Sequence, residues 1–435
     1  MAQALTAVAA TALVLTGCAS GGGDTAAVDI TADPEYSGTI SILTKFGGEP
    51  LGPFFENAAA AYTELHPDVD FELIQETDQS VKDKTKTLTA SQALPDIYFT
   101  WTGDWAENFI EAGLAADLTP VIAPDTEWGS TFGEASLDAF KYDGKYFAIP
   151  LYNNGKFMGY NTAIFDELGL DVPETFEGLI EACGVIKDAG YEPIAFGNKD
   201  GWPGLHYLQQ LFAYNVPTGE LKADFVPETA TLDHEGYVKS MNEFKTLVDE
   251  CTNTGEGSNG VLYTTSQQAM ADGKAAMYYQ EILEFDTINA EGNVVNGQGF
   301  DIFKLPVPED AAGDAQAIEG SPEGYLINSK SPRAALAVDF MKFVTNMENA
   351  TIMASPPYGQ PSTVIDAVSA ESSSPAVIEG IEQVNEASQI VIWLDTVTVP
   401  DVAFAWLAGG EGLVSGSMTA ENVLESVRAA SESAK

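Results

Sequence analysis

The chain has 435 residues, which is more than a single hydrophobic core usually serves, so we expect two domains or one body with two lobes. Its formal net charge is −46, from 65 acidic residues against 19 lysines and arginines. A surface this negative repels nucleic acid and anionic lipid headgroups, so nucleic acid is not expected as a partner and any membrane contact requires an anchor.

The first residues have the pattern of an export signal. Residues 5–16 form an apolar run too short to span a bilayer, and Gly17 and Cys18 follow it. This ending resembles the lipobox of bacterial lipoproteins, which implies a signal peptide over residues 1–17 and lipidation of Cys18. A flexible tether over residues 18–37 would then hold the protein on the outer face of the cell membrane. The residues before the apolar run carry no positive charge, which departs from the usual signal.

Short β-rich runs alternate with helical runs in the next part of the chain. We expect strands at 39–44, 69–74 and 96–99, separated by helices at 52–66 and 80–93. This alternation predicts a parallel α/β sheet, in which ligands bind beyond the carboxyl ends of the strands. The loops placed at such a cleft comprise residues 45–51, 76–80 and 100–105.

A second unit is expected after residue 152. Its helical periodicity and strand-like runs occur at 176–189, 204–214, 235–251, 265–274, 300–306, 324–328, 332–345 and 419–435. Cys183 and Cys251 lie on the apolar faces of two of these helices, so helices packed face to face would join them in a disulfide. Two buried free thiols are the alternative.

Several motifs occur in the order and at the spacing of a known family. The most specific is Tyr142–Pro150 (YDGKYFAIP), followed by Gly159–Asn161 (GYN) and Ile164–Leu170 (IFDELGL). Together with Pro95–Phe99 (PDIYF) and Asp272–Met277 (DGKAAM), they resemble the extracellular solute-binding proteins of family 1, the carbohydrate-import class that includes maltodextrin binders. The resemblance covers nearly the whole mature chain.

This resemblance implies an α/β fold of the periplasmic-binding-protein type (type II), with two lobes joined by a hinge. Lobe 1 would comprise residues 38–152 and 307–347, and lobe 2 residues 153–306 and 348–435. Closure of the lobes on a sugar or oligosaccharide would produce the form that is delivered to the transmembrane subunits of an ABC importer. The resemblance implies a monomer without a cofactor.

Aromatic residues are the first candidates for the site, because sugars present apolar C–H faces ringed by hydroxyl groups. In maltodextrin binders, the loop that holds Trp101 and Asp104 here supplies an aromatic ring and an acid to the sugar. Trp202 lies in a turn-rich segment, and Trp393 lies late in the chain, where the second lobe of the family often places ligand aromatics. A place in the core is the alternative for both.

Polar side chains complete the predicted site. The chain passes the cleft at Asn153 and its two neighbours, a position that contacts sugar in relatives. Gln280 and Glu281 occupy a family ligand position that often holds a tryptophan, so hydrogen bonds are expected there in place of stacking. The polar candidates are Glu49, Tyr152, Asn153, Asn154, Gln280, Glu281 and Glu323. An acidic lining would also suit a cationic solute.

Other functions are less consistent with the sequence. Paired carboxylates hydrolyse glycosides, but among 65 acids such pairs arise by chance, and no nucleophile elbow, P-loop or zinc-protease motif occurs. The three histidines are far apart and lack metal-ligand spacing. We therefore expect a binding protein with no catalytic residues and no metal. The alternatives are a polyol or a cationic compound as the solute, an acidic secreted glycoside hydrolase, or an adhesion lipoprotein.

Overall fold

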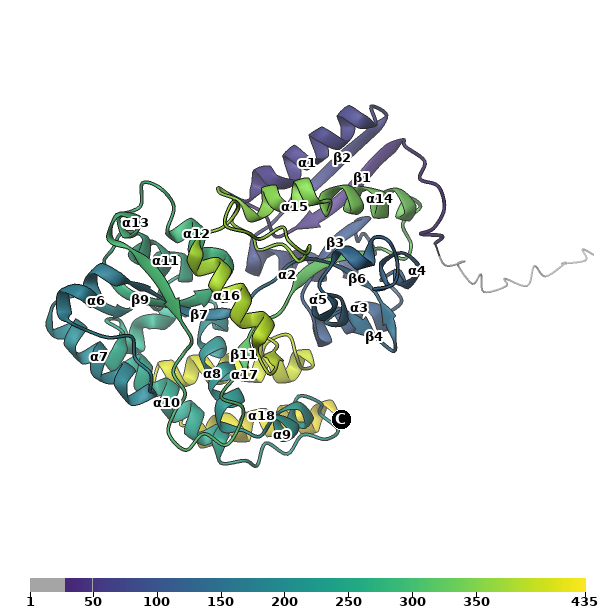
Figure 1. Ribbon diagram of the computed structural model, residues 1–435. Helices are drawn as coiled ribbons and strands as arrows, with labels where there is room; N and C mark the ends of the chain where they lie inside the picture. The colour runs from purple at the N-terminus through teal and green to yellow at the C-terminus, as the bar shows by residue number, and fades with distance from the viewer. Residues whose placement is uncertain (1–27, 49) are drawn as a thin grey trace, which may run out of the picture.

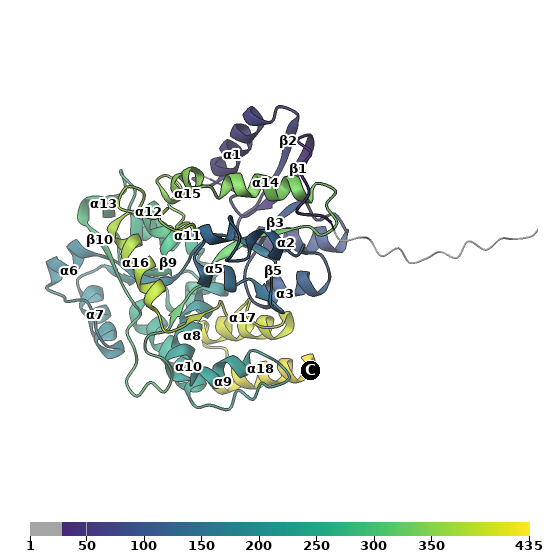
Figure 2. The same ribbon diagram turned by 45° about the vertical axis from the view of Figure 1, so that its right-hand side comes forward.

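The computed structural model describes residues 28–48 and 50–435 (Figure 1). The predicted signal peptide, Cys18 and Glu49 lie outside these residues. The described chain forms two lobes, and each is built on its own β-sheet with helices around it (Figures 1 and 2).

The first lobe contains a five-stranded sheet in the order β2-β1-β3-β12-β6. The strands are β1 Gly38–Thr44, β2 Val69–Gln75, β3 Ile97–Thr100, β6 Ala148–Tyr152 and β12 Glu323–Ile327. β1 pairs in parallel with β2 and β3, whereas β12 is antiparallel to both β3 and β6. The prediction of a parallel sheet therefore holds only for the first three strands, because β12 returns from the second lobe and enters this sheet from the opposite direction.

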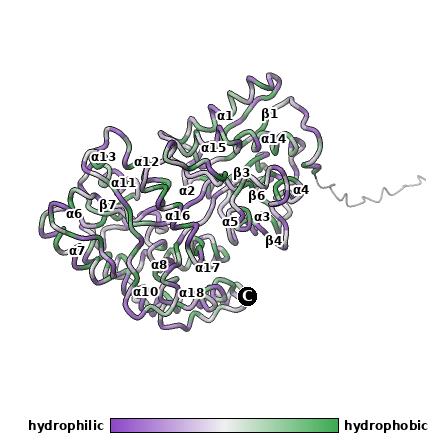
Figure 3. Tube along the Cα trace, viewed as in Figure 1, coloured by the Kyte–Doolittle hydropathy of each residue, from purple (hydrophilic) through white to green (hydrophobic). Residues whose placement is uncertain are grey.

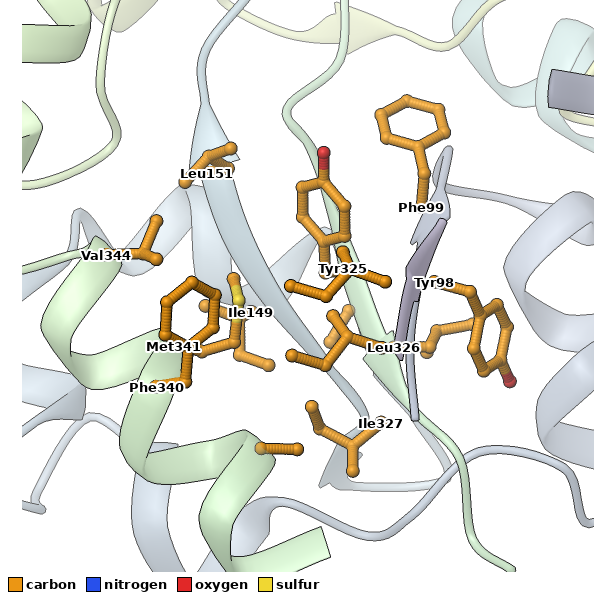
Figure 4. Packing of buried hydrophobic residues seen from close by; sticks show 14 of the residues in the cluster. Tyr98, Phe99, Ile149, Leu151, Tyr325, Leu326, Ile327, Phe340, Met341 and Val344 are labelled. Atoms are coloured by element: carbon orange, nitrogen blue, oxygen red, sulfur yellow. The ribbon is translucent and has the colours of Figure 1, made fainter. Parts of the chain in front are cut away.

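Helices of the first lobe share one hydrophobic cluster with this sheet. They are α1 Gly52–Leu65, α2 Asp78–Ala90, α3 Asp104–Glu111, α4 Thr119–Ile122, α5 Glu134–Asp138, α14 Ala334–Val344 and α15 Met347–Ala354, with the 3-10 turn η1 Gly129–Thr131 and the hairpin of β4 Lys141–Tyr142 and β5 Lys145–Tyr146. In Figure 3 the tube of α1 changes repeatedly between hydrophobic and hydrophilic colours, as expected for a helix with one buried face. Figure 4 shows Phe340, Met341 and Val344 of α14 beside the strands β6 and β12.

The second lobe contains a four-stranded sheet in the order β10-β7-β9-β8. β7 is antiparallel to β9 and β10, and β8 is parallel to β9. The strands are β7 Lys156–Asn161, β8 Glu192–Ile194, β9 Ala275–Glu281 and β10 Phe300–Phe303, and a separate parallel pair consists of β11 Ile318–Glu319 and β13 Ile390–Val391.

The helices of the second lobe are α6 Thr162–Leu168, α7 Phe176–Asp188, α8 Trp202–Asn215, α9 Thr218–Asp224, α10 Gly236–Cys251, α11 Tyr263–Ala271, α12 Phe285–Ile288, α13 Val294–Gln298, α16 Pro375–Glu386, α17 Pro400–Val414 and α18 Ala420–Ala434, with the 3-10 turns η2 Gly255–Gly260 and η3 Ile282–Glu284. The central helix of this lobe is α8, in which every residue is buried and which packs against α9, α10 and α17. Cys183 of α7 and Cys251 of α10 are fully buried and joined by a disulfide. Nowhere in residues 28–48 and 50–435 does a helix have the length and apolar character needed to cross a membrane.

The hydrophobic core of the first lobe extends past residue 347. Ala350, Met353, Tyr358 and Ala367 are buried in the same cluster as the strands of the first sheet. Val377 of α16, by contrast, packs in a cluster with residues of the second sheet. The lobe limits derived from the family resemblance, in which residues 348–435 belong to lobe 2, remain a prediction.

Candidate ligand-binding site

A small pocket lies between the two lobes and opens to solvent. Residues of the first sheet and α2 line it on one side, and residues of α8, β9 and the segment after β13 line it on the other. The lining residues are Lys45, Gln79, Lys82, Trp101 and Glu323 on the first side and Trp202, His206, Glu281, Trp393, Asp395 and Thr396 on the second.

Strand ends place the side chains of the first lobe at the pocket. Lys45 directly follows β1, Trp101 directly follows β3, and Glu323 is the first residue of the antiparallel β12. All three therefore meet at the edge formed by the carboxyl ends of the parallel strands, where ligands bind in open α/β sheets. Sequence reasoning predicted this edge and the loop that holds Lys45, but did not single out the lysine.

The carboxylate of Glu323 is held by two neighbours. Nζ of Lys45 lies 2.5 Å from Oε2 of Glu323, and the hydroxyl of Tyr152 donates a hydrogen bond to the same oxygen. Burial raises the pKa of Glu323 to about 7, although the ammonium of Lys45 acts against this rise. Tyr152 is fully buried behind Glu323 and orients it, and it is not part of the pocket lining.

A second buried lysine organises the opposite side. Nζ of Lys156 lies 3.5 Å from Oε1 of Glu281 and donates a hydrogen bond to the side-chain oxygen of Gln280. The amide of Asn154 donates to the other oxygen of Glu281. Gln280 is only 1% exposed and lies behind the lining, whereas Glu281 reaches the pocket. Asn154 and Gln280 therefore hold Glu281 and Lys156 in place.

Each of the three pocket tryptophans has a lysine near its ring. Nζ of Lys82 lies 4.9 Å from the ring centre of Trp101, and Nζ of Lys156 lies 5.3 Å from that of Trp202 and 5.7 Å from that of Trp393. These distances are within the range of cation–π attraction, which fixes both partners. The pocket thus combines rigid aromatic surfaces with charged groups that donate and accept hydrogen bonds.

The fully buried helix α8 positions the second-lobe side of the pocket. Trp202 begins α8, and His206 follows one turn later, with its ring 4.9 Å from Trp202 and 4.7 Å from Trp393. The side chain of Gln209 donates to the backbone oxygen of Ile392 at 2.7 Å, which ties the segment of Trp393 to α8. Burial lowers the pKa of His206 well below its usual value, so the imidazole is neutral. Among the described residues, Nδ1 of His206 has no hydrogen-bond partner.

Two predicted residues lie elsewhere. The side chain of Asn153 accepts a hydrogen bond from the hydroxyl of Ser136 at 2.8 Å, and Asn153 is not part of the pocket lining. Asp104 begins α3 and lines a neighbouring groove, where its carboxylate accepts a hydrogen bond from Asn108 at 2.6 Å. The structure therefore brings together Trp101, Trp202, Glu281, Glu323 and Trp393 at the pocket itself.

Sequence reasoning missed six lining residues: Lys45, Gln79, Lys82, His206, Asp395 and Thr396. Two of them, Lys45 and Gln79, lie in loops that were expected at the cleft. His206 lies four positions after Trp202, so the helical period alone places it on the same face. Asp395 closely follows Trp393, whose place at the pocket would have pointed to it.

Residues 48–351, well over half of the chain, match the family described as bacterial extracellular solute-binding protein. The chain belongs to this family, which consists of extracellular solute-binding proteins and not of enzymes. The resemblance drawn from the sequence motifs is therefore confirmed.

Curated relatives match the chain over part of their length. The maltotriose-binding protein of Pyrococcus abyssi is 29% identical over 149 residues, which cover 34% of this chain and 30% of that protein. The multiple sugar-binding protein of Streptococcus mutans is 24% identical over 212 residues, which cover 47% of this chain and 49% of that protein. The chain thus spans 30% and 49% of the length of these two relatives, which is less than half of each.

Solved structures match over nearly the whole chain. A protein from a study of xylan utilization by Caldanaerobius polysaccharolyticus has a TM-score of 0.83 at 22% identity, covering 90% of this chain and 99% of that one. A chitin oligosaccharide binding protein has a TM-score of 0.80 at 23% identity, covering 91% and 98%. At these identities the likeness shows the fold alone, and it confirms the predicted two-lobed α/β fold of the periplasmic-binding-protein type.

Proposed function

We propose that the chain is the extracytoplasmic substrate-binding component of an ABC importer and that it captures a sugar or oligosaccharide in the pocket between its lobes. The observation that carries this proposal is the convergence of Trp101, Trp202 and Trp393 on one pocket together with paired polar groups. Aromatic faces stack on the C–H surfaces of a sugar, and the surrounding carboxylates and ammonium groups bind its hydroxyls. The named relatives, which bind maltotriose, multiple sugars and chitin oligosaccharides, support the same class of solute.

The charge balance of the pocket favours a neutral solute over a cationic one. Each carboxylate of the lining is close to a lysine: Glu323 to Lys45, Glu281 to Lys156, and Asp395 to Lys82. The carboxylates thus leave no excess negative charge for a cationic compound, and the lysines leave no excess positive charge for a phosphate ester. Alternating donors and acceptors fit the hydroxyl groups of a sugar.

The remaining parts of the proposal concern location and partners. A lipid anchor on Cys18 and a tether to residue 37 would hold the chain at the outer face of the cell membrane. As a monomer it would present its closed, loaded form to the transmembrane subunits of the importer. The sequence pattern of the first residues and the family membership support this arrangement.

A thermal-shift screen of the purified protein against monosaccharides, oligosaccharides, polyols and cationic solutes tests the proposal. A ligand at 100 times its dissociation constant adds about 2.7 kcal/mol to the free energy of unfolding, which is a readable shift in melting temperature. We expect a shift with a sugar or oligosaccharide that is recovered unchanged. A shift only with a cationic solute would refute the sugar, and consumption of the sugar would refute the binding function.

A further inference from the structure

Two carboxylates from opposite lobes line the same pocket. Glu323 begins β12 of the first lobe, and Glu281 ends β9 of the second lobe. The lobes touch across the pocket, where Nζ of Lys82 lies 2.6 Å from Oδ2 of Asp395, and the free space left among the lining side chains is about 30 Å³. A space of this size holds a few water molecules at most, so the two carboxylates are held close together.

The lysine that pairs with each carboxylate belongs to the same lobe as that carboxylate. Nζ of Lys45, next to β1, lies 2.5 Å from Oε2 of Glu323, and Nζ of Lys156, on β7, lies 3.5 Å from Oε1 of Glu281. Neither pair has to break when the lobes separate. Separation does relieve the repulsion between the two carboxylates, which water screens only weakly because their side chains are 2% and 12% exposed.

The proton affinity of Glu323 reflects this closed arrangement. Burial raises the pKa of Glu323 to about 7, against the effect of Lys45, and the carboxylate of Glu281 adds to the rise. When the lobes separate, water reaches Glu323 and Glu281 moves away, so both causes of the raised pKa weaken. The pKa of Glu323 in the open form therefore lies nearer the usual glutamate value of 4.5.

The other charged and titratable groups around Glu323 come from its own lobe and from the opposite wall of the pocket. They are Tyr152, Tyr325, Lys82, His206, Lys156 and Asp395. Burial raises the pKa of both tyrosines and lowers the pKa of the histidine, so these three side chains stay uncharged near neutral pH.

We propose that Glu323 and Glu281 form a pH-sensitive switch, in which uptake of a proton by Glu323 favours the closed form of the two lobes. This inference goes beyond the capture of a sugar, because it concerns the protein without a ligand. At low pH both forms hold the proton and closure is most favoured. As the pH rises towards about 7, the open form loses its proton first, so closure becomes less favourable. Above about pH 7 both forms are ionised, and the closure equilibrium no longer changes with this group.

Small-angle scattering of the ligand-free protein at about pH 5 and about pH 8 tests this switch. We expect a larger radius of gyration at the higher pH, because the loss of one proton shifts the closure equilibrium by up to about tenfold per pH unit. Glu323→Gln mimics the protonated carboxyl group and should keep the smaller radius of gyration at both pH values. Glu64→Gln, at an exposed position of α1, is the matched control and should respond as the wild type does.

Glu281→Gln is a second variant, which leaves the pair of Lys45 with Glu323 intact. It removes the repulsion across the pocket, so its response to pH should be smaller than that of the wild type. Circular dichroism establishes that each variant is folded. A wild-type radius of gyration that does not change with pH, or a full response in either folded variant, would overturn the switch. No sugar is used in these measurements, so their failure leaves the proposed sugar capture intact, and a protein that binds no sugar would overturn that function alone.

Discussion

Trp202 is the residue at which several parts of the site meet. Its ring lines both the pocket and the groove, and it contacts His206, Tyr263 and the ammonium of Lys156. It is only 7% exposed, so a role in the core and a role in ligand binding are both physically reasonable. Measurement of affinity and stability in the same variant separates these roles.

Trp202→Leu should weaken ligand binding by about 1–3 kcal/mol, because leucine cannot stack on a sugar ring. Trp406→Leu is its control, since Trp406 packs against Phe212 and Tyr237 in the core of the second lobe. The control should lower the melting temperature and keep the affinity. Unchanged affinity in Trp202→Leu, with a lowered melting temperature, would assign Trp202 to the core.

Glu319 is a buried acid on the short strand β11, and its backbone N–H donates a hydrogen bond to the side chain of Gln210 on α8. It is fully buried, and among the described residues neither of its carboxyl oxygens has a hydrogen-bond partner. Burial raises the pKa of Glu319 well above its usual value, and the carboxylates of Glu281 and Asp395 add to this rise, while Lys156 opposes it. The folded chain therefore keeps this carboxyl protonated to a higher pH than the unfolded chain does.

The difference between the folded-state and unfolded-state pKa of Glu319 makes the stability of the protein depend on pH in one direction. In the unfolded chain the pKa of Glu319 is near the usual glutamate value of 4.5, so folding takes up a proton above that pH. Stability is therefore lost as the pH rises from about 4.5 towards the folded-state pKa. The variant Glu319→Gln has no carboxyl group to ionise, so its stability does not fall in this way. As the pH rises over this range, the unfolding free energy of the variant should exceed that of the wild type by up to about 1.4 kcal/mol more for each pH unit.

Chemical denaturation at about pH 5 and about pH 8 measures the effect of Glu319→Gln. Glu64→Gln, at an exposed position of α1, serves as the control and should show little difference between the two conditions. If the difference in unfolding free energy between Glu319→Gln and the wild type is the same at both pH values, the carboxyl group of Glu319 is not held neutral by burial.

At the scale of elements, the disulfide between α7 and α10 is the main covalent tie. It closes a loop with a sequence separation of 68 residues. In the chain-entropy account, loss of this link costs about 4 kcal/mol of stability. The double variant Cys183→Ala/Cys251→Ala should lose about this much in urea denaturation and keep its ligand affinity, because neither cysteine lines the pocket. Unchanged stability would show that the link does not constrain the unfolded chain.

Elements with a clear hydrophobic period were predictable, and α17 was not. It contains Gly409, Gly410 and Gly412, which are poor helix formers and obscure the period. The structure explains them by close packing, since a Cβ atom on Gly409 would lie 2.4 Å from Val423 of α18 and one on Gly412 would lie 2.6 Å from Met418. Tertiary contacts of this kind leave no local signal in the sequence.

The lysines of the site could not be predicted from the sequence either, because their partners lie far away along the chain. Lys45 pairs with Glu323 and Lys82 with Asp395, each across most of the chain. A lysine in a loop or near the start of a helix normally indicates a solvated surface. The aromatic residues were predictable because tryptophan is scarce, with six in the chain, and because family motifs placed three of them near a cleft.

At the scale of the whole molecule, a few polar contacts join the lobes around the pocket. Nζ of Lys82 on α2 lies 2.6 Å from Oδ2 of Asp395, and the backbone N–H of Trp105 donates to the oxygen of Thr396 at 3.2 Å. The side chains of Lys82 and Asp395 are 17% and 5% exposed, so water screens this pair only weakly. The pair is placed to stabilise the closed form of a hinged protein.

Removal of this ion pair should favour the open form. Asp395→Asn and Lys82→Met should each lower ligand affinity about tenfold and increase the radius of gyration of the free protein in small-angle scattering. Because each single change leaves the other partner without its counter-charge, the double variant should lose less than the sum of the two. Strictly additive losses with no change in scattering would contradict a role in closure.

The most direct test of the central claim is a titration of intrinsic tryptophan fluorescence, because Trp101, Trp202 and Trp393 are three of the six tryptophans and line the pocket. The account predicts a saturable change with a neutral sugar or oligosaccharide, a much weaker response in Trp202→Leu, and recovery of the sugar unchanged. A folded protein that gives no saturable response to any sugar, but responds to a cationic solute, would contradict it.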